Sequence, residues 1–433
     1  MKSICLCFQI HHSFHLQTFR FLDIGGNKSY YNLPLIEKEI TEAATTCYLP
    51  SNDFILSLIH KYKEKFKFTF YISGSAIELF LMYAPEVLTS FRTLADTGQV
   101  EFLGGTSCHS LVSLTNQKGE FYSQVKAHQL QIENLFGKKP LVFANSDLIY
   151  SNQIGKDISD FGYRSVLTNS SRKTLIWRSP NYVYSNCIKP QLQVYFRNEL
   201  ISNELESALN NLKQKNTANF LSLLNDLKPE EPLLNIYLDY LALGGPEISK
   251  KQQYLRKVLT KLNTSHQLEF IFPSEIKERY ESVGDISSIE PICYVKDFHP
   301  LYYPGNELQR EAITQLYKLK PLIDQINDPM LTRDWQCLQT SNHIHTMDHQ
   351  HPNYQNDNPF INGYGSKYEA FINYMNVLDD FKIKVKSSLT RKVKKSILNP
   401  EKNKSTARSG TPFRTINLQH KAALYMLQNC LND

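Results

Sequence analysis

The run Ile4-Cys5-Leu6-Cys7-Phe8-Gln9-Ile10, followed directly by His11-His12-Ser13-Phe14-His15, sets the pattern that predicts the fold. The first part is a β-rich run that is apolar on both faces, and the second part is polar and titratable. Similar short runs recur along the chain, separated by stretches with the periodicity of amphipathic helices. The candidate strands are residues 4–10, 67–73, 100–103, 141–143, 165–167, 233–238 and 268–272. This alternation predicts βα units and a parallel sheet.

Strands that are apolar on both faces fit a barrel covered by helices and an open doubly wound sheet equally well, so the pattern leaves both open. Neither a GxGxxG motif nor a P-loop follows any of these strands. A nucleotide-binding sheet therefore has no positive support.

After Pro304 the pattern changes to helices without intervening strands. Residues 305–324, 329–340 and 366–389 have helical periodicity, and residues 353–365 read as a loop. We therefore predict a barrel-like domain over residues 1–300 and a helical domain over residues 301–389. A basic tail, residues 390–433, is predicted to be disordered apart from a short helix over residues 416–431.

The positive charge of the chain is concentrated in its last part. The net charge is +6, but residues 381–433 contain twelve Lys and Arg against two acidic residues, so residues 1–380 carry −4. We interpret this tail as a solvated extension and do not expect nucleic acid or a membrane as a partner. Eight cysteines without a CxxC pair, and the lack of a long apolar run, favour a cytoplasmic protein with reduced thiols.

Titratable residues gather where the candidate strands end, which is where parallel barrels place their reacting groups. Asp147 follows the fourth strand and Asp239 follows the sixth. Two carboxylates on one barrel face are the minimum for glycosidic cleavage, in which one acts as nucleophile or base and the other as acid. An aspartate directly after a strand is also a common helix cap, and the two residues alone favour that simpler interpretation.

A set of short stretches, in one order from residue 3 to about residue 380, resembles glycoside hydrolase family 57. These stretches are residues 5–11, 14, 19–25, 73–74, 83–88, 101–103, 109–111, 145, 148–151, 179–182, 305–309, 338–341 and 368–378. The resemblance implies an α/β fold, an incomplete parallel (β/α)7 barrel followed by a C-terminal helical bundle. It also implies a retaining, α-amylase- or glucanotransferase-like enzyme for α-1,4-glucans such as glycogen or maltooligosaccharides, with no metal or organic cofactor.

The resemblance further assigns roles to individual residues. Asp147 stands at the nucleophile position, where the family has Glu, and Asp239 stands at the acid/base position. The sugar contacts that it implies are His11, His109, Asn145, Trp335 and Asn342.

The chain departs from the family pattern around these positions. Ser13 ends a triplet that reads His-Gln-Pro in the family, Gly105 stands where an acidic residue is expected, residues 241–246 replace Glu-Thr-Phe-Gly-Glu-His, and Asn342 replaces Asp. Replacing Glu by Asp147 pulls the carboxylate back by roughly 1–1.5 Å, and a misplacement of about 1 Å can cost 10²-fold in rate. We therefore expect weakened activity, with a catalytically inactive α-glucan-binding or regulatory protein as the alternative.

Three further hypotheses concern histidines and tryptophans. His11 and His15 are four residues apart, as in a metal-dependent deacetylase, although they leave a strand and not a helix. The histidine-rich residues 343–351 are either a metal site or, as we favour, an exposed polar loop. Trp177 and Trp335 are either sugar-stacking rings or simply core residues.

Overall fold

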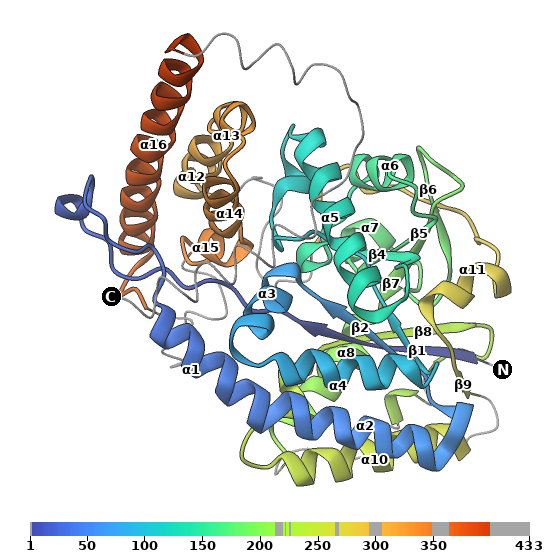
Figure 1. Ribbon diagram of the computed structural model, residues 1–433. Coiled ribbons are helices and arrows are strands. Elements are labelled where there is room, and N and C mark those ends of the chain that lie inside the picture. Colours follow the sequence, from blue (N-terminus) through green and yellow to red (C-terminus); the bar gives the residue numbers. More distant parts are fainter. Residues whose placement is uncertain are drawn as a thin grey trace.

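The computed structural model describes residues 2–212, 220, 222–224, 227–264, 268–293, 305–348 and 363–398. Its centre is a ring of seven parallel strands, enclosed by helices (Figure 1). The ring consists of β1 (Lys2–Ile10), β2 (Phe68–Ile72), β3 (Val100–Phe102), β4 (Val142–Ala144), β5 (Ser165–Asn169), β7 (Gln193–Arg197) and β8 (Leu233–Asp239).

The ring closes because each of these strands has a parallel neighbour on both sides. β1 pairs with β2 and with β8, β5 pairs with β4 and β7, and β7 meets β8 at Arg197 and Asn235. A parallel bridge between Gly104 and Phe143 joins β3 to β4. The structure therefore selects the barrel over the open sheet, and it confirms the predicted α/β barrel followed by helices.

Three more strands extend this sheet. β9 (Leu268–Phe270) pairs with the beginning of β1, β6 (Tyr184–Asn186) runs antiparallel to β7, and β10 (Asp285–Ile286) pairs with β6. The seven candidate strands of the sequence analysis thus included β9 and missed β7. β7 was missed because Gln193 and Arg197 place polar residues at both of its ends, and no helix precedes it.

Alternation along β1 separates two cores. Cys5 and Cys7 point into the barrel, whereas Ile4, Leu6, Phe8 and Ile10 pack against the helices outside. The other residues of the inner cluster are Tyr71, Leu103, Val142, Ala144, Leu148, Leu167, Val183, Tyr195, Leu233, Tyr237, Ile271 and Ile276. Small thiols on β1 leave room for the tyrosine rings that fill the barrel from opposite strands.

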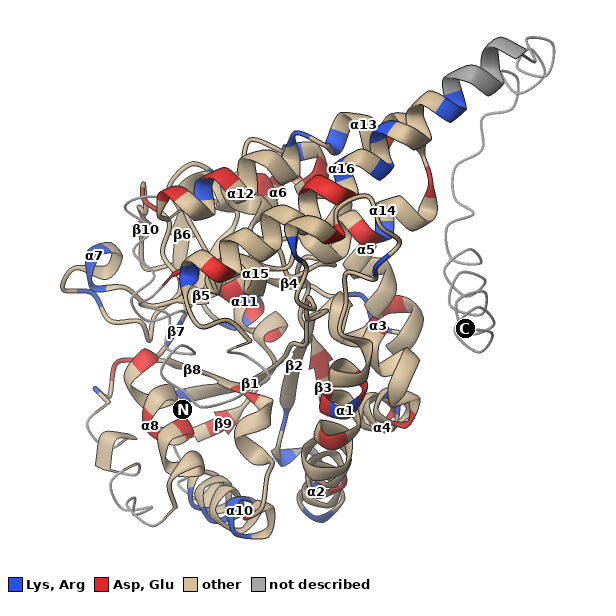
Figure 2. Cartoon of the chain, turned by 90° about the vertical axis from the view of Figure 1, so that its left-hand side faces the viewer, with Lys and Arg blue, Asp and Glu red and all other residues tan. Residues whose placement is uncertain are grey.

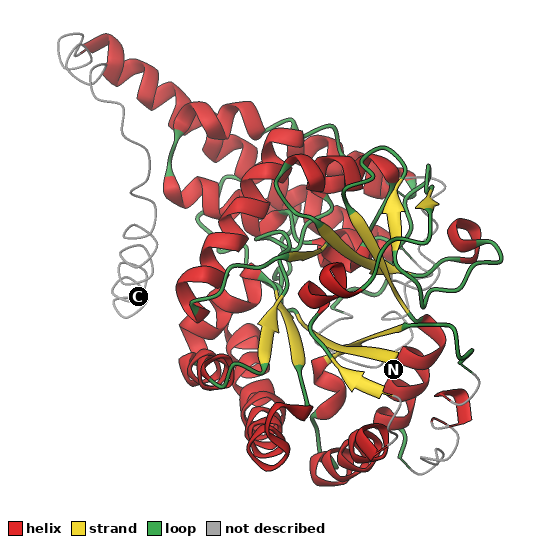
Figure 3. Cartoon of the chain, turned by 90° about the vertical axis from the view of Figure 1, so that its right-hand side faces the viewer, coloured by secondary structure: helices red, strands yellow, loops and turns green. Residues whose placement is uncertain are grey.

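Helices cover the outside of the barrel, and the charged residues belong mainly to helices and not to the ring strands (Figure 2). The helices are α1 (Leu33–Ala43), α2 (Leu49–Tyr62), α3 (Gly74–Tyr83), α4 (Pro85–Asp96), α5 (Lys118–Phe136), α6 (Asn152–Asp160), α7 (Arg172–Leu175), α8 (Glu199–Asn210), α10 (Ile248–Thr264) and α11 (Ile276–Arg279). Seen from the other side, helices lie to the left of the strands, above them and below them, and loops with short helices lie on the right (Figure 3). Among the described helices, none is both long and apolar enough to cross a bilayer.

The C-terminal helices pack together beside the barrel (Figure 1). They are α12 (Glu307–Tyr317), α13 (Lys320–Ile326), α14 (Pro329–Leu338), α15 (Ser341–His345) and α16 (Lys367–Leu398). α16 continues past its predicted end at residue 389, so the helix includes the first residues of the predicted tail. The predicted short helix over residues 416–431 lies outside the described residues.

Candidate active site

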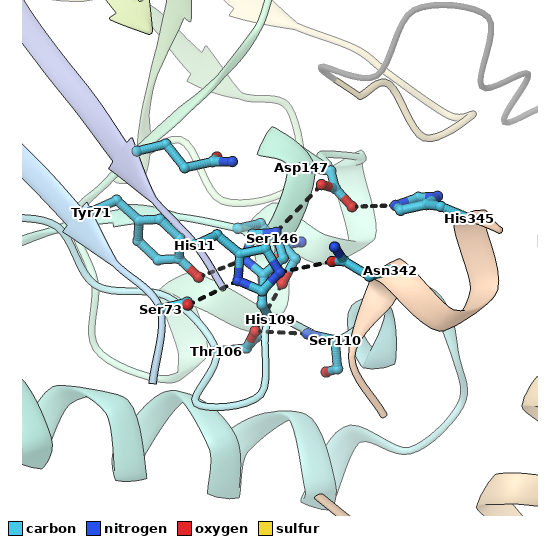
Figure 4. Close-up of polar contacts among 12 residues, drawn as sticks. His11, Tyr71, Ser73, Thr106, His109, Ser110, Ser146, Asp147, Asn342 and His345 are labelled. Atoms are coloured by element: carbon cyan, nitrogen blue, oxygen red, sulfur yellow. Dashed lines mark hydrogen bonds and ion pairs between the residues drawn. The ribbon is translucent and has the colours of Figure 1, made fainter. Parts of the chain in front are cut away.

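The ring strands are parallel, so their carboxyl ends share one mouth, where polar side chains from distant parts of the chain meet (Figure 4). His11 follows β1, Ser73 follows β2, His109 lies in the loop after β3, and Asp147 follows β4. α15 reaches the same mouth from the helical region, because Ser341 N donates to His109 O at 3.0 Å.

Asp147 lies in a tight 3-10 turn, Ser146–Leu148, in which Asp147 and Leu148 have positive φ angles of 53° and 51°. Non-glycine residues rarely adopt this conformation, so the surroundings must hold it. Asn145 does so: its Nδ2 donates to Ile149 O at 3.0 Å and to Ser113 Oγ at 2.8 Å, and its Oδ1 accepts from Ser146 N. Asn145 therefore positions Asp147 through hydrogen bonds to protein atoms, and its predicted role as a sugar contact stays a prediction.

The Asp147 carboxylate lies between two imidazoles. His345 Nε2 donates to Oδ2 at 2.8 Å, and His109 Nε2 makes a longer contact of 3.4 Å with Oδ1. Burial alone would raise the pKa of this carboxyl, but His345 and then His109 outweigh burial and hold the pKa of Asp147 well below its usual range. Asp147 is thus an anion at neutral pH, with both of its oxygens engaged.

The hydrogen-bond partners of His109 indicate which of its two ring nitrogens carries a hydrogen. Burial, and then the charge of Asp147, raise the pKa of Tyr71, so its hydroxyl stays protonated and donates to His109 Nδ1 at 2.9 Å. The other nitrogen, Nε2, then carries the hydrogen that faces Asp147. The hydrogen bonds therefore run in one direction, because Tyr71 donates to His109 and His109 donates to Asp147.

His11 completes the cluster by stacking on His109, with ring centroids 3.9 Å apart. Its Nδ1 lies 2.9 Å from Ser73 Oγ, and its Nε2 donates to Asn342 Oδ1 at 2.7 Å. Burial lowers the pKa of His11 well below its usual value, so the ring is neutral. The predicted residues His11, His109 and Asn342 are therefore brought together.

Asp239 ends β8 at the same mouth and is paired in register with Gln9 of β1. Burial raises the pKa of its carboxyl, although the backbone N–H of Leu241 and the nearby His12 act in the opposite direction. Its Oδ1 accepts from Leu241 N at 2.9 Å and so caps the 3-10 turn Tyr240–Leu243. The capping role considered in the sequence analysis is thus present, and one oxygen of Asp239 is used for it.

A second histidine pair, which the sequence analysis did not connect, follows β1. Glu39 binds His12 Nδ1 through Oε1 at 2.9 Å and His15 Nε2 through Oε2 at 2.5 Å. Burial opposes ionisation, but these two hydrogen bonds lower the pKa of Glu39 to about 2. His12 Nε2 lies 2.7 Å from Tyr48 Oη.

Two predictions about histidines do not fit this geometry. His15 binds Glu39 while His11 binds Ser73 and Asn342, so the two rings do not converge as metal ligands, and no metal-binding group of three such side chains is found within the described residues. The favoured interpretation of residues 343–351 as an exposed loop is wrong for its first part, because His343 and His345 are buried in α15. His349 and His351 lie outside the described residues.

Trp335 does not reach the mouth of the barrel. Its side chain is 2% exposed, its Nε1 donates to Leu316 O at 3.1 Å, and its ring meets Tyr317 edge to face. The implied role of Trp335 as a sugar contact is therefore corrected to that of a core residue of the helical region.

Gly105 also has a structural explanation. A Cβ at this position would lie 2.3 Å from the Tyr71 ring and 3.0 Å from Ala144 O. The space that an acidic side chain would need there is filled by Tyr71, which supports His109 instead.

Parallel barrels place their reacting groups at the carboxyl-terminal mouth, and this barrel gathers its polar and titratable side chains there. Residues 5–287 match the family model described as Glycosyl hydrolase family 57, and the chain belongs to this family.

Relatives support this assignment. The chain is 27% identical, over 89% of its length and 85% of the relative's, to a protein of Methanocaldococcus jannaschii named "Putative alpha-amylase". It is similar in fold to a family 57 branching enzyme of Thermococcus kodakaraensis, at 13% identity and a TM-score of 0.61, over 79% of this chain and 85% of that one. A 4-alpha-glucanotransferase of Thermococcus litoralis, at 12% identity and a TM-score of 0.57, matches 79% of this chain, which spans only 56% of that larger protein.

Proposed function

We propose that the chain acts on α-1,4-glucans, such as glycogen or maltooligosaccharides, by the retaining mechanism, with Asp147 as nucleophile and Asp239 as acid/base. The observation that carries this proposal is that the pKa values of two carboxyls at one mouth are shifted in opposite directions. The pKa of Asp147 is lowered, and that of Asp239 is raised. A retaining site needs an ionised nucleophile and a protonated acid. The names of the relatives, an α-amylase, a branching enzyme and a glucanotransferase, add support.

The chemistry follows from these two roles. Asp147 attacks the anomeric carbon while Asp239 protonates the departing glycosidic oxygen, which leaves a glycosyl ester on Asp147. Asp239 then takes a proton from water or from a sugar hydroxyl, and the resulting oxygen nucleophile attacks the anomeric carbon and frees Asp147. Attack by water gives hydrolysis, and attack by a sugar hydroxyl gives transfer.

Turnover is expected to be slow, because Asp147 has no unengaged oxygen. The hydrogen bonds from His345 and His109 weaken as negative charge leaves Asp147 during attack, and a hydrogen bond to a charged group contributes about 1.5–3 kcal/mol. A barrier raised by that amount slows the reaction about ten- to a hundredfold. The missing methylene of Asp147, relative to Glu, adds to this effect.

A second candidate function is recognition of α-glucan without turnover. The observation that favours it is that both carboxyls already serve the protein: two imidazoles engage Asp147, and Asp239 caps a turn. A site of this kind would retain the proposed sugar contacts of His11 and Asn342 and would not perform the reaction.

Incubation of the purified chain with maltoheptaose distinguishes these functions. We expect slow cleavage by the wild type, faster cleavage by Asp147→Glu, and loss of cleavage in Asp239→Asn, which can still cap its turn. Asp324→Asn, which changes an exposed carboxylate paired with Lys320, is the matched control and should behave as the wild type. Measurable maltoheptaose binding without cleavage by the wild type or by Asp147→Glu would establish the recognition function, and absence of both binding and cleavage would refute the glucan proposal.

We further propose a cytoplasmic location. Among the described residues, Cys5, Cys7, Cys47, Cys108, Cys187 and Cys337 form no disulfide, which is typical of a reducing compartment. Neither a nucleic acid nor a membrane is part of this proposal.

A further inference from the structure

The loop that follows β5 exposes two large apolar side chains. Trp177 is 85% exposed and its neighbour Ile176 is 74% exposed, although indole rings are usually at least half-buried. Ile289, from a separate segment, is 87% exposed. We call Ile176, Trp177 and Ile289 the Trp177 patch.

The loop that exposes Trp177 has a strained backbone at the preceding residue, Ile176. Arg178 N donates to Leu175 O at 2.8 Å, and Ile176 has φ 59° and ψ −98°. This is the first central position of a type II′ turn, which strongly favours glycine, and a β-branched residue there is an outlier. Strain of this kind persists where the surrounding structure enforces it, and it is common at ligand-binding sites.

The base of the patch is fixed by several contacts. Arg178 Nη1 donates to Asp285 O at 2.6 Å, and its guanidinium lies 5.9 Å from the centre of the Tyr184 ring. Thr174 Oγ1 lies 3.0 Å from Ser288 Oγ, which joins the loop to the segment that carries Ile289. The exposed Trp177 ring and its isoleucine neighbours therefore lie on an ordered base, which limits the entropy lost when a ligand binds.

The patch lies on the same side of the barrel as Asp147. The loop begins where β5 ends, at Asn169, and the carboxyl ends of the parallel ring strands lie on the side of Asp147. α7 and this loop stand out from the barrel (Figure 2). The Ile289 segment is tied to this side as well, because Ile292 bridges to Tyr150, shortly after Asp147.

We propose that the Trp177 patch is a second sugar-binding site, on which a strand of α-glucan stacks outside the barrel mouth; the choice of glucan rests on the proposed function. The apolar face of a glucose ring packs on an indole as other apolar groups do. The site would hold a polymer near the barrel and raise its local concentration at the mouth.

The size of the patch favours a glucan strand over a second protein copy. Three side chains supply on the order of 500 Å², whereas a stable protein interface buries about 800 Å² on each partner. A short run of glucose units needs no larger surface.

Native gel electrophoresis with and without glycogen in the gel tests this inference. We expect glycogen to retard the wild type, Trp177→Ala to weaken glycogen affinity about tenfold or more, and Trp177→Phe to retain part of it. Phe21→Ala is the matched control, because it removes another exposed aromatic ring, 75% exposed, from a different loop. It should leave the retardation unchanged.

Several outcomes would overturn the inference: equal retardation of the wild type and Trp177→Ala, no retardation of the wild type, or retardation by heparin but not by glycogen. A dimer in sedimentation that Trp177→Ala dissociates would also overturn it, in favour of a second copy. The proposed function is judged separately. Glycogen binding that depends on Trp177, without cleavage of maltoheptaose, removes only the catalytic proposal, whereas cleavage with glycogen binding independent of Trp177 removes only this inference.

Discussion

The Asp147 carboxylate is the residue on which the chemistry of this barrel depends. It receives hydrogen bonds from two sides, and one of its donors, His109, is itself oriented by Tyr71. Because Tyr71 donates to one ring nitrogen of His109, the hydrogen of His109 lies on the nitrogen that faces Asp147. The cluster therefore stabilises the ionised form of Asp147. The same contacts that keep Asp147 ionised also restrain it as a nucleophile.

Removing one imidazole should make this restraint measurable. His345→Gln is expected to lower the free energy of unfolding at pH 7 by about 1–3 kcal/mol, because a buried carboxylate loses a charged or strongly polar partner. The folded-state pKa of Asp147 lies below the unfolded value, so the stabilisation is complete above about pH 4 and is lost as the pH falls through the folded-state pKa. Urea unfolding of both proteins at pH 7 and at decreasing pH measures the difference.

The difference between the two proteins should narrow as the pH falls below about 4, since a protonated Asp147 no longer needs His345. A difference in stability that stays constant over this range would mean that His345 acts through packing alone. His343→Gln provides the comparison, because His343 is buried in the same helix and its ring lies tilted against that of Tyr374 instead of binding Asp147.

The sequence predicted part of this cluster. His11 and His109 follow strands, and parallel strands end at one mouth, so their meeting followed from the fold. His345 was missed because a histidine-rich run resembles an exposed loop, and only tertiary structure shows that α15 turns one of these rings toward Asp147. Trp335 was misplaced because the amphipathic pattern of α14 does not tell which element covers it.

At the scale of elements, the strands that are apolar on both faces were predictable, and those with polar ends were not. β1 and β8 are runs of buried residues, whereas β7 is bounded by Gln193 and Arg197. Arg197 is buried because its Nε donates to Tyr237 O at 2.9 Å and its Nη2 to Asn203 Oδ1 at 2.7 Å. A hydropathy pattern cannot predict a buried arginine, because the residues that accept its hydrogen bonds lie elsewhere in the sequence.

The loop after β3 is packed closely enough for a single methyl group to matter. Gly105→Ala should lower the free energy of unfolding by about 1–3 kcal/mol, because its Cβ would meet Tyr71 and Ala144 O at or below contact distance. Displacement of Tyr71 would also disturb its bond to His109. Thermal unfolding measures the first effect, and maltoheptaose binding measures the second.

Gly119→Ala is the control for this substitution, since a Cβ at Gly119 meets no atom within 4 Å and the residue lies in α5. It should leave the stability unchanged or raise it slightly. Equal stability of Gly105→Ala and Gly119→Ala would show that Tyr71 does not fill the space beside Gly105.

At the scale of the whole molecule, the N-terminal part of the chain is fastened to the last helix. Phe19 N donates to Asn373 Oδ1 at 2.6 Å, and Asp380 accepts from Gly25 N at 2.7 Å and from Tyr30 Oη at 2.6 Å. The segment between β1 and α1 lies beside α16 (Figure 1). The barrel and the helical region are therefore joined by this segment as well as by α15, and they are expected to unfold together.

The place where α16 ends decides how the basic tail can be tested. Lys392 Nζ donates to Gln325 O at 3.0 Å and Ile326 O at 2.8 Å, so a truncation at residue 390 would remove contacts of the helical region along with the tail. A truncation after Leu398 keeps α16 whole and removes five Lys and Arg and two acidic residues, which lowers the net charge from +6 to +3. Because the candidate sugar sites all lie on described residues before this point, glycogen retardation and maltoheptaose binding at 0.15 M salt should match those of the full chain. Loss of glucan binding in the truncated protein would place the binding site in the tail and contradict the assignment to the barrel mouth.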